Sequence, residues 1–156
     1  MKIRLLAAGT RLPGWVDAAC ADYARRFGSD LRFELVEIPL AERGARADLA
    51  RATAREGEKM LGLIRAGDFV VALEVGGKPM STGQLALWLE ARRREGQDLV
   101  FLIGGPDGLA PGCLERADLR LSLSALTFPH GLARVMLIEQ LYRACSVNKG
   151  HPYHRA

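Results

Sequence analysis

The chain has 156 residues, of which 49% are hydrophobic and 26% are charged, and its formal net charge is +4 at pH 7. This length suits one domain with one core, and no apolar run approaches the roughly 18 to 20 residues that span a bilayer, which argues against a membrane-spanning protein. So small a positive charge is compatible with a polyanionic partner but does not establish one.

Five apolar segments are predicted to be strands, the first of them at the N-terminus. Its apolar core is too short for a signal peptide, and we therefore expect a cytoplasmic location. Three segments are nearly continuous apolar runs, as in strands that helices cover on both faces, whereas residues 31–38 alternate and are expected nearer an edge. The five strands are predicted at residues 2–8, 31–38, 69–75, 99–103 and 119–123.

Helical periodicity appears between these strands. Apolar residues keep a spacing of three and four over residues 16–27, and more loosely over residues 49–64. Ser81 and Gln84 form a capping box ahead of a third helix. A last helix, at about residues 132–146, carries a wide apolar stripe, which favours a subunit interface in addition to a contact with the sheet.

Strands that alternate with helices predict an α/β fold with a mostly parallel sheet flanked by helices, in one domain of residues 1–156. Ligands of such sheets bind beyond the carboxyl ends of the strands. Three glycine-rich or hydroxyl-rich segments are predicted to be loops there, at residues 76–79, 104–108 and 122–129. We expect them to converge on one site, whose main-chain groups suit an adenosine-like ligand.

Motifs for several other chemistries are missing. The loop at residues 104–108 has neither the GxGxxG spacing of dinucleotide sites nor a Walker lysine. The chain has no G-x-S-x-G elbow, and its carboxylates show no paired spacing that indicates hydrolysis. Basic residues cluster near residues 43–55, at residues 92–94 and in the tail, and each cluster alone is more often a solvated helix face than a nucleic-acid site.

Cysteines and histidines do not indicate a metal site. The cysteines are few and widely spaced, which fits buried thiols better than a disulfide framework or a metal knuckle. Only His151 and His154 are spaced as a ligand pair, and tail histidines are usually exposed, so we expect no metal. The residues concerned are Cys20, Cys113, Cys145, His130, His151 and His154.

The C-terminal tail, residues 151–155, places two imidazoles, a phenol and a guanidinium within five residues. These groups suit a reaction in which a cofactor supplies the reactive group and the protein orients it and manages one proton; methyl transfer from a sulfonium is such a reaction. His154 is the candidate general base because imidazole titrates near neutral pH. Arg155 suits a phosphate or an anionic ring, and Tyr153 suits stacking or a proton relay.

These residues resemble the SPOUT superfamily of trefoil-knotted methyltransferases, and more closely the ribosomal RNA large subunit methyltransferase H family. The resemblance runs along essentially the whole chain, and the tail is its most family-specific motif. Asp107 stands where Glu is familiar in this family, and Gly131 where Pro would be equally familiar. The other anchors are residues 8–10, 37–39, 77–79, 102–106, 122–127 and 129–130.

The resemblance implies a C-terminal trefoil knot that holds S-adenosylmethionine, and a homodimer in which the tail of one protomer completes the site of the other. It further implies methylation of N3 of a pseudouridine in large-subunit (23S) rRNA, on assembled ribosomes. The implied cofactor contacts are Leu73, Gly104, Leu123, Ser124, Ala125, Leu126, Thr127 and Phe128.

Other functions compete with this interpretation. The chain could be a SPOUT methyltransferase for another rRNA site or for tRNA, although the tail argues against this. It could also be a ribosome assembly factor that keeps the fold without catalysis. A nucleotide-binding signalling module would need a phosphate cradle, which residues 104–108 do not provide convincingly.

Overall fold

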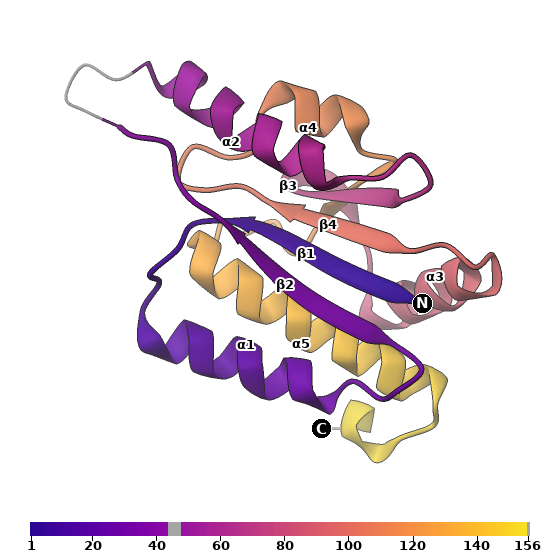
Figure 1. The fold of residues 1–156 in the computed structure, drawn as a ribbon. Helices are drawn as coiled ribbons and strands as arrows, with labels where there is room; N and C mark the ends of the chain where they lie inside the picture. Colours follow the sequence, from indigo (N-terminus) through magenta and orange to yellow (C-terminus); the bar gives the residue numbers. More distant parts are fainter. Residues whose placement is uncertain (44–47, 156) are drawn as a thin grey trace.

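The computed structural model describes residues 1–43 and 48–155, and its centre is a five-stranded sheet (Figure 1). The strand order is β2-β1-β4-β3-β5, and the four pairings between neighbouring strands are all parallel. The predicted α/β fold with a parallel sheet is therefore confirmed. The strands are β1 (Lys2–Ala8), β2 (Arg32–Ile38), β3 (Phe69–Pro79), β4 (Leu99–Ile103) and β5 (Leu119–Ser122).

One boundary prediction is wrong, at the end of β3. Residues 76–79 were predicted to be a loop, but they continue the strand and pair with β5. The register shifts between Leu73 and Lys78, both of which align with Leu121, so the intervening residues bulge out of the ladder. The pairing with β5 resumes beyond this bulge, at Lys78 and Pro79.

Helices cover both faces of the sheet (Figure 1). Because side chains alternate along a strand, β1 contributes Ile3 and Leu5 to the core under one helical layer, and Leu6 to the core under the other. The first layer holds α1 (Gly14–Arg26), α3 (Thr82–Arg94) and α5 (His130–Asn148), and the second holds α2 (Leu49–Leu63) and α4 (Pro111–Arg116).

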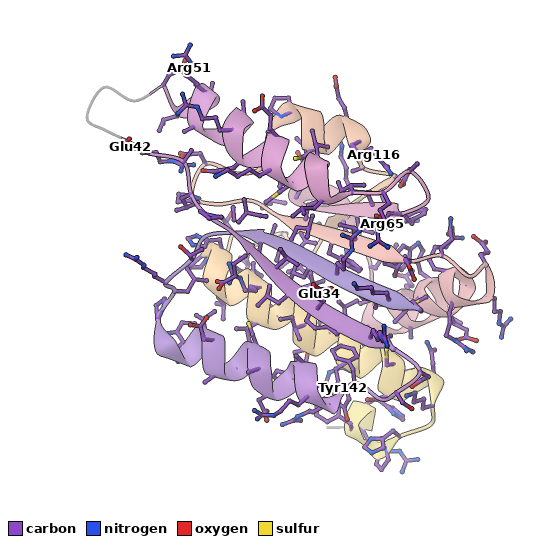
Figure 2. All side chains as sticks on the ribbon, in the orientation of Figure 1. Glu34, Glu42, Arg51, Arg65, Arg116 and Tyr142 are labelled. Carbon is purple, nitrogen blue, oxygen red and sulfur yellow. The ribbon has the colours of Figure 1, made fainter. Side chains whose placement is uncertain are left out.

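The edge position of β2 is confirmed, as its alternating pattern predicted. Glu34 lies on this strand toward solvent (Figure 2), and its carboxylate pairs with Lys2 of β1 at 2.7 Å. The capping box at the start of α3 is also confirmed, because the Ser81 side chain accepts from the Gln84 main chain and the Gln84 side chain accepts from the Ser81 main chain. The sequence analysis missed α4, whose 6 residues are too few to show helical periodicity.

The C-terminal part of the chain runs from β5 through residues 123–129 into α5 and ends in a short 3₁₀ turn, Pro152–Arg155. Helix α5 has 19 residues and extends beyond both predicted ends. In the described part of the chain, no helix is both long and apolar enough to cross a membrane. The threading of this part into a trefoil knot stays a prediction.

Candidate functional site

A cavity of about 610 Å³ opens at the carboxyl edge of the sheet. It lies between the ends of β3 and β4, and the segment from Leu123 to His130 closes its third side. Gly76, Gly104 and Ser124 all line it, so the predicted convergence of the three segments is confirmed. Its volume is within the range of small-molecule sites in proteins, about 300 to 1,000 Å³.

The residues predicted to contact a cofactor gather in this cavity. Seven of the eight line it, and Ala125, the exception, lies between two that do. Six of the eight belong to one continuous segment, which explains why the sequence could place them together. The lining residues of this set are Leu73, Gly104, Leu123, Ser124, Leu126, Thr127 and Phe128.

The glycine loop after β4 is folded back on itself. The main-chain N–H of Gly108 donates to the Gly105 carbonyl at 3.1 Å, and Gly108 adopts a φ of +78°, a left-handed conformation that favours glycine. A Cβ on Gly104 would lie 2.3 Å from the Gly108 carbonyl carbon and 2.6 Å from the Leu109 nitrogen. Only glycine fits at position 104, and the loop presents main chain to the cavity.

The serine segment after β5 uses its own hydroxyls to hold its shape. The Ser122 hydroxyl donates to the Ser124 carbonyl at 2.9 Å, and the Ser124 hydroxyl accepts from the Leu126 main-chain N–H at 3.0 Å. Both hydroxyls are therefore engaged within the segment. Leu126 is 70% exposed and forms an apolar rim beside the cavity. The Ser124 hydroxyl accepts and so keeps its own proton for donation, and Thr127 also lines the cavity, so a ligand there meets main chain, apolar surface and two hydroxyl groups.

The charge of the cavity distinguishes between ligand classes. Among the described residues that line it, none is Lys or Arg, and the ionisable ones are Glu74 and His130. The pKa of His130 lies below its ordinary value because the ring is partly buried and because Arg134 is close, so the imidazole is neutral at pH 7. Arg120, which is not a lining residue, pairs with Glu74 at 3.8 Å. A lining whose described residues include a carboxylate and no Lys or Arg favours polyphosphates little and is compatible with a positively charged ligand.

His130 and Glu74 are lining residues that the sequence analysis did not assign to the site. Glu74 directly follows Leu73, so its place at a strand end was the available signal. His130 begins α5, and its ring packs against the turn after β1, where a Cβ on Gly9 would lie 3.5 Å from His130 Nε2. One turn further along α5, the buried Arg134 guanidinium binds the Gly9 carbonyl at 3.2 Å.

The tail follows the C-terminal end of α5 (Figure 1). The cavity is lined by His130 at the start of the helix, and the tail follows Asn148 at its end. A helix of 19 residues is about 28 Å long at 1.5 Å per residue. Within one chain, the structure therefore does not bring Tyr153, His154 and Arg155 to the predicted cofactor residues.

Tyr153 is held against α1 and α5 by several contacts. Its hydroxyl lies 3.2 Å from Glu139 Oε1 and 3.3 Å from the Tyr23 hydroxyl. Its ring meets the Tyr142 ring edge-on at 4.7 Å between centroids, and the Arg143 guanidinium lies 4.9 Å from its centre. Burial, the Tyr23 hydroxyl and the Glu139 charge together raise the pKa of Tyr153. Tyr153 is thus a neutral, fixed phenol.

His154 is partly buried, and its Nδ1 hydrogen-bonds to the main-chain carbonyl of His151. A carbonyl oxygen only accepts, so Nδ1 carries the proton in this contact, and in the neutral imidazole Nε2 is then the acceptor. This is the tautomer that a general base needs. Arg155 beside it is exposed, and no described ion pair includes it.

Among the described residues, the cysteines and the potential metal ligands indicate neither a reactive thiol nor a metal site. Cys20 and Cys113 are buried, as predicted, while Cys145 is partly buried. Burial raises the pKa of each thiol, that of Cys145 to about 11, so all three are unreactive thiols at neutral pH. No group of three or more His, Cys, Asp or Glu side chains within residues 1–43 and 48–155 could hold a metal ion.

Known proteins and a family model match this chain over nearly its whole length. A family model described as "Predicted SPOUT methyltransferase" matches residues 1–154. A protein from Pseudomonas fluorescens named "Ribosomal RNA large subunit methyltransferase H" is 51% identical over 155 residues, which cover 99% of this chain and 100% of that protein. A protein of the same name from Alkalilimnicola ehrlichii is 53% identical over 156 residues, which cover 100% of both.

A solved structure shows that the fold is shared more widely. It is described as that of a probable methylase family protein from Haemophilus influenzae, and its TM-score is 0.58. The match covers 97% of this chain and 69% of that one, at 13% sequence identity. At this identity the match supports the fold alone.

Proposed function

The chain belongs to the SPOUT methyltransferase family, and we propose that it methylates N3 of a pseudouridine in the 23S rRNA of the large ribosomal subunit, with S-adenosylmethionine as the methyl donor. The resemblance inferred from the sequence is confirmed by this membership. The observation that carries the proposal is the cavity at the carboxyl edge, where seven of the eight expected cofactor residues meet.

The cavity fits an adenosyl sulfonium better than a nucleotide triphosphate. Main chain from Gly104 and from residues 123–128 would hold the adenosine part, together with the hydroxyls of Ser124 and Thr127, which line the cavity. No Lys or Arg is among the described lining residues, and Arg120, which lies outside the lining, is 3.8 Å from the Glu74 carboxylate, so the charge of this carboxylate is already partly compensated. The chemistry supplied by the bound cofactor is an electrophilic methyl group.

The protein's own task is to position the acceptor base and to remove one proton. The N3–H of a pseudouridine is weakly acidic, so a base near it favours attack on the methyl group. We assign this proton to Nε2 of His154, whose other ring nitrogen is bonded to the His151 carbonyl. Tyr153 would stack on the acceptor or relay the proton, and the unpaired Arg155 would bind a phosphate or an anionic ring.

The proposal requires a homodimer in which each tail serves the cavity of the partner subunit. The length of α5 separates the cavity and the tail of one chain by about 28 Å. An antiparallel arrangement of two such helices would place the tail of each beside the start of the other. Leu137, Ile138 and Leu141 of the apolar stripe are fully buried in the core of the chain itself. The partly buried residues of α5, Val135, Met136, Tyr142 and Cys145, are what it would offer to such an interface.

Assembled ribosomes are the proposed substrate because the chain offers little to select one nucleotide alone. Its net charge is only +4, and most arginines of α3 are neutralised by neighbouring glutamates. Surfaces of the ribosome would supply the missing recognition. A ribosomal substrate also places the reaction in the cytoplasm.

Calorimetry with S-adenosylmethionine, S-adenosylhomocysteine and ATP tests the cofactor assignment. We expect both adenosyl ligands to bind and ATP to bind more weakly, because the described lining residues include no Lys or Arg to hold its phosphates. Binding of ATP in preference to both would favour the nucleotide-binding alternative. Cofactor binding without any methyl transfer would favour a non-catalytic assembly factor.

A further inference from the structure

Arg43 connects three separate parts of the chain near the cavity. Its guanidinium donates twice to Glu56 on α2, from Nη1 to Oε2 at 2.6 Å and from Nη2 to Oε1 at 3.1 Å. Its Nε donates to Asp107 Oδ2 at 2.8 Å, and Nη1 also reaches the Ala41 carbonyl at 3.1 Å. One fork therefore binds two carboxylates that are far apart in sequence, an arrangement that the planar guanidinium suits.

Glu56 is the buried partner of Arg43 and anchors the guanidinium to α2. It is only 3% exposed, and its Oε2 also accepts from the Ala41 main-chain N–H at 3.0 Å. A buried carboxylate is costly unless it is paired and hydrogen-bonded, so Glu56 holds Arg43 firmly. Hydrogen bonds with Glu56, and then with Asp107, raise the pKa of Arg43 above its ordinary value.

Asp107 is the partner of Arg43 that belongs to the loop beside the cavity. It lies within the glycine loop, between Pro106 and Gly108, both of which line the cavity. The same loop packs on the segment before Arg43, because a Cβ on Gly105 would lie 2.8 Å from Leu40 and 3.7 Å from Glu56 Oε1. The Asp107 side chain itself points away from the cavity lining and to Arg43.

We propose that Arg43 is a positioning residue for the cofactor loop: by bridging Asp107 to the buried Glu56, it holds residues 104–108 in the conformation that forms the cavity. This inference rests on the proposed function, since it takes the cavity to be the S-adenosylmethionine site. Arg43 is not among the residues that line the cavity. Its loss loosens the loop, so it weakens cofactor binding and leaves the reacting groups in place.

Three variants test the bridge, in the full-length protein. Asp107→Asn keeps the side-chain shape and removes the charge from the loop. Arg43→Lys keeps a cation beside Glu56 but loses the fork that reaches both carboxylates. Arg43→Met with Glu56→Gln removes the bridge without leaving a buried charge unpaired. We expect the Kd and the KM for S-adenosylmethionine to rise about three- to tenfold in each, with kcat at saturating cofactor within about twofold of the wild type.

Hydrogen exchange of the cofactor-free protein measures how firmly the bridge holds the loop, independently of any ligand. The amides of residues 104–108 should exchange about threefold faster or more in each variant, while those of β1 and β4 stay protected. Adding Asp107→Asn to the Arg43→Met and Glu56→Gln background should change little further, because the bridge is already broken.

Arg93→Met is the matched control. Its guanidinium also binds one carboxylate twice, from Nε and Nη2 to Glu90 at 2.9 Å and 2.8 Å, but on α3, in the other helical layer. We expect wild-type Kd, KM and loop exchange for this variant. Thermal unfolding of every variant checks that the fold persists.

Each outcome bears on one claim. Unchanged loop exchange in folded Asp107→Asn and Arg43→Lys proteins would overturn the positioning role. Faster exchange with an unchanged Kd would overturn its link to the cofactor. If the wild type does not bind S-adenosylmethionine, the proposed function fails, while the exchange data still decide whether Arg43 holds the loop.

Discussion

Arg134 Nη1 donates to Glu37 Oε2 at 2.7 Å, which joins the first turns of α5 to the end of edge strand β2. The two partners differ sharply in exposure, because the Arg134 side chain is fully buried and that of Glu37 is 36% exposed. The guanidinium also holds the carbonyl of Gly9, and the His130 ring lies beside the same glycine, where a Cβ would be 3.5 Å from His130 Nε2. One ion pair therefore fixes the helix start that lines the cavity.

This difference in exposure predicts unequal effects on stability. Glu37→Ala leaves a fully buried cation with only the Gly9 carbonyl, and we expect it to lower the free energy of unfolding by about 3 kcal/mol. Arg134→Met leaves a carboxylate that water can reach, so its cost should be smaller, about 1 to 2 kcal/mol. Urea unfolding measures both. Equal losses, or a larger loss for Arg134→Met, would contradict this explanation.

Gly104→Ala tests whether the main chain of the loop at residues 104–108 forms part of the cofactor site. The added Cβ would lie 2.3 Å from the Gly108 carbonyl carbon, so the loop must open, and we expect cofactor affinity to fall about tenfold or more. Gly62→Ala on α2 is the control, because nothing lies within 4 Å of its Cβ. Calorimetry should show wild-type affinity for the control. Wild-type affinity in Gly104→Ala would show that this loop is not the cofactor site.

The lowered pKa of His130 predicts a pH dependence of stability. Burial, and then the Arg134 charge, lower the pKa of His130 in the folded protein below the ordinary value of 6.5. At a pH between this lowered pKa and 6.5, the unfolded chain therefore binds a proton at His130 that the folded chain does not. The free energy of unfolding should therefore fall as the pH drops from about 6.5 through the folded-state pKa. Above about pH 7.5 this contribution is fully present and constant.

His130→Gln removes this titration and should flatten that part of the curve. Urea unfolding at about pH 8 and about pH 5 compares the two proteins, and the wild type should lose more stability between them. The same loss in both proteins would assign the acid sensitivity to other groups.

Mixed dimers test whether tails act between protomers. One variant carries Gly104→Ala and keeps its tail, and the other keeps its cavity and lacks residues 151–156. At a cofactor concentration below the wild-type Kd, each alone should have little activity, since the cavity of the first is mostly empty and the second has no tail. Co-expressed protomers should regain activity, because the intact cavity of one meets the intact tail of the other. Failure to regain activity in verified heterodimers would place each tail at its own cavity or remove it from catalysis.

The sequence was sufficient for most of the fold and for the local part of the site. Apolar runs located all five strands, and the expected cofactor residues were found together because six of them are neighbours in one segment. Residues 76–79 were mispredicted because Gly-Gly-Lys-Pro is typical of a turn, while its pairing with β5 depends on residues 121–122, far along the chain.

Long-range contacts were beyond sequence reasoning for the same reason. Arg134 lies 125 residues from Gly9, and Arg43 lies 64 residues from Asp107, so no periodicity or spacing reports either contact. The basic cluster that includes Arg43 was interpreted as a solvated helix face, yet Arg43 is engaged with two carboxylates. Arg46 of that cluster lies outside the described residues.

Transfer of a labelled methyl group from S-adenosylmethionine to ribosomes that lack the modification tests the proposed function most directly. Assembled ribosomes, free large subunits and naked rRNA are compared, and the labelled nucleotide is mapped. We predict label at N3 of one pseudouridine in 23S rRNA, strongest with assembled ribosomes. Label at another site, or no label from a protein that binds the cofactor, would contradict the proposed function.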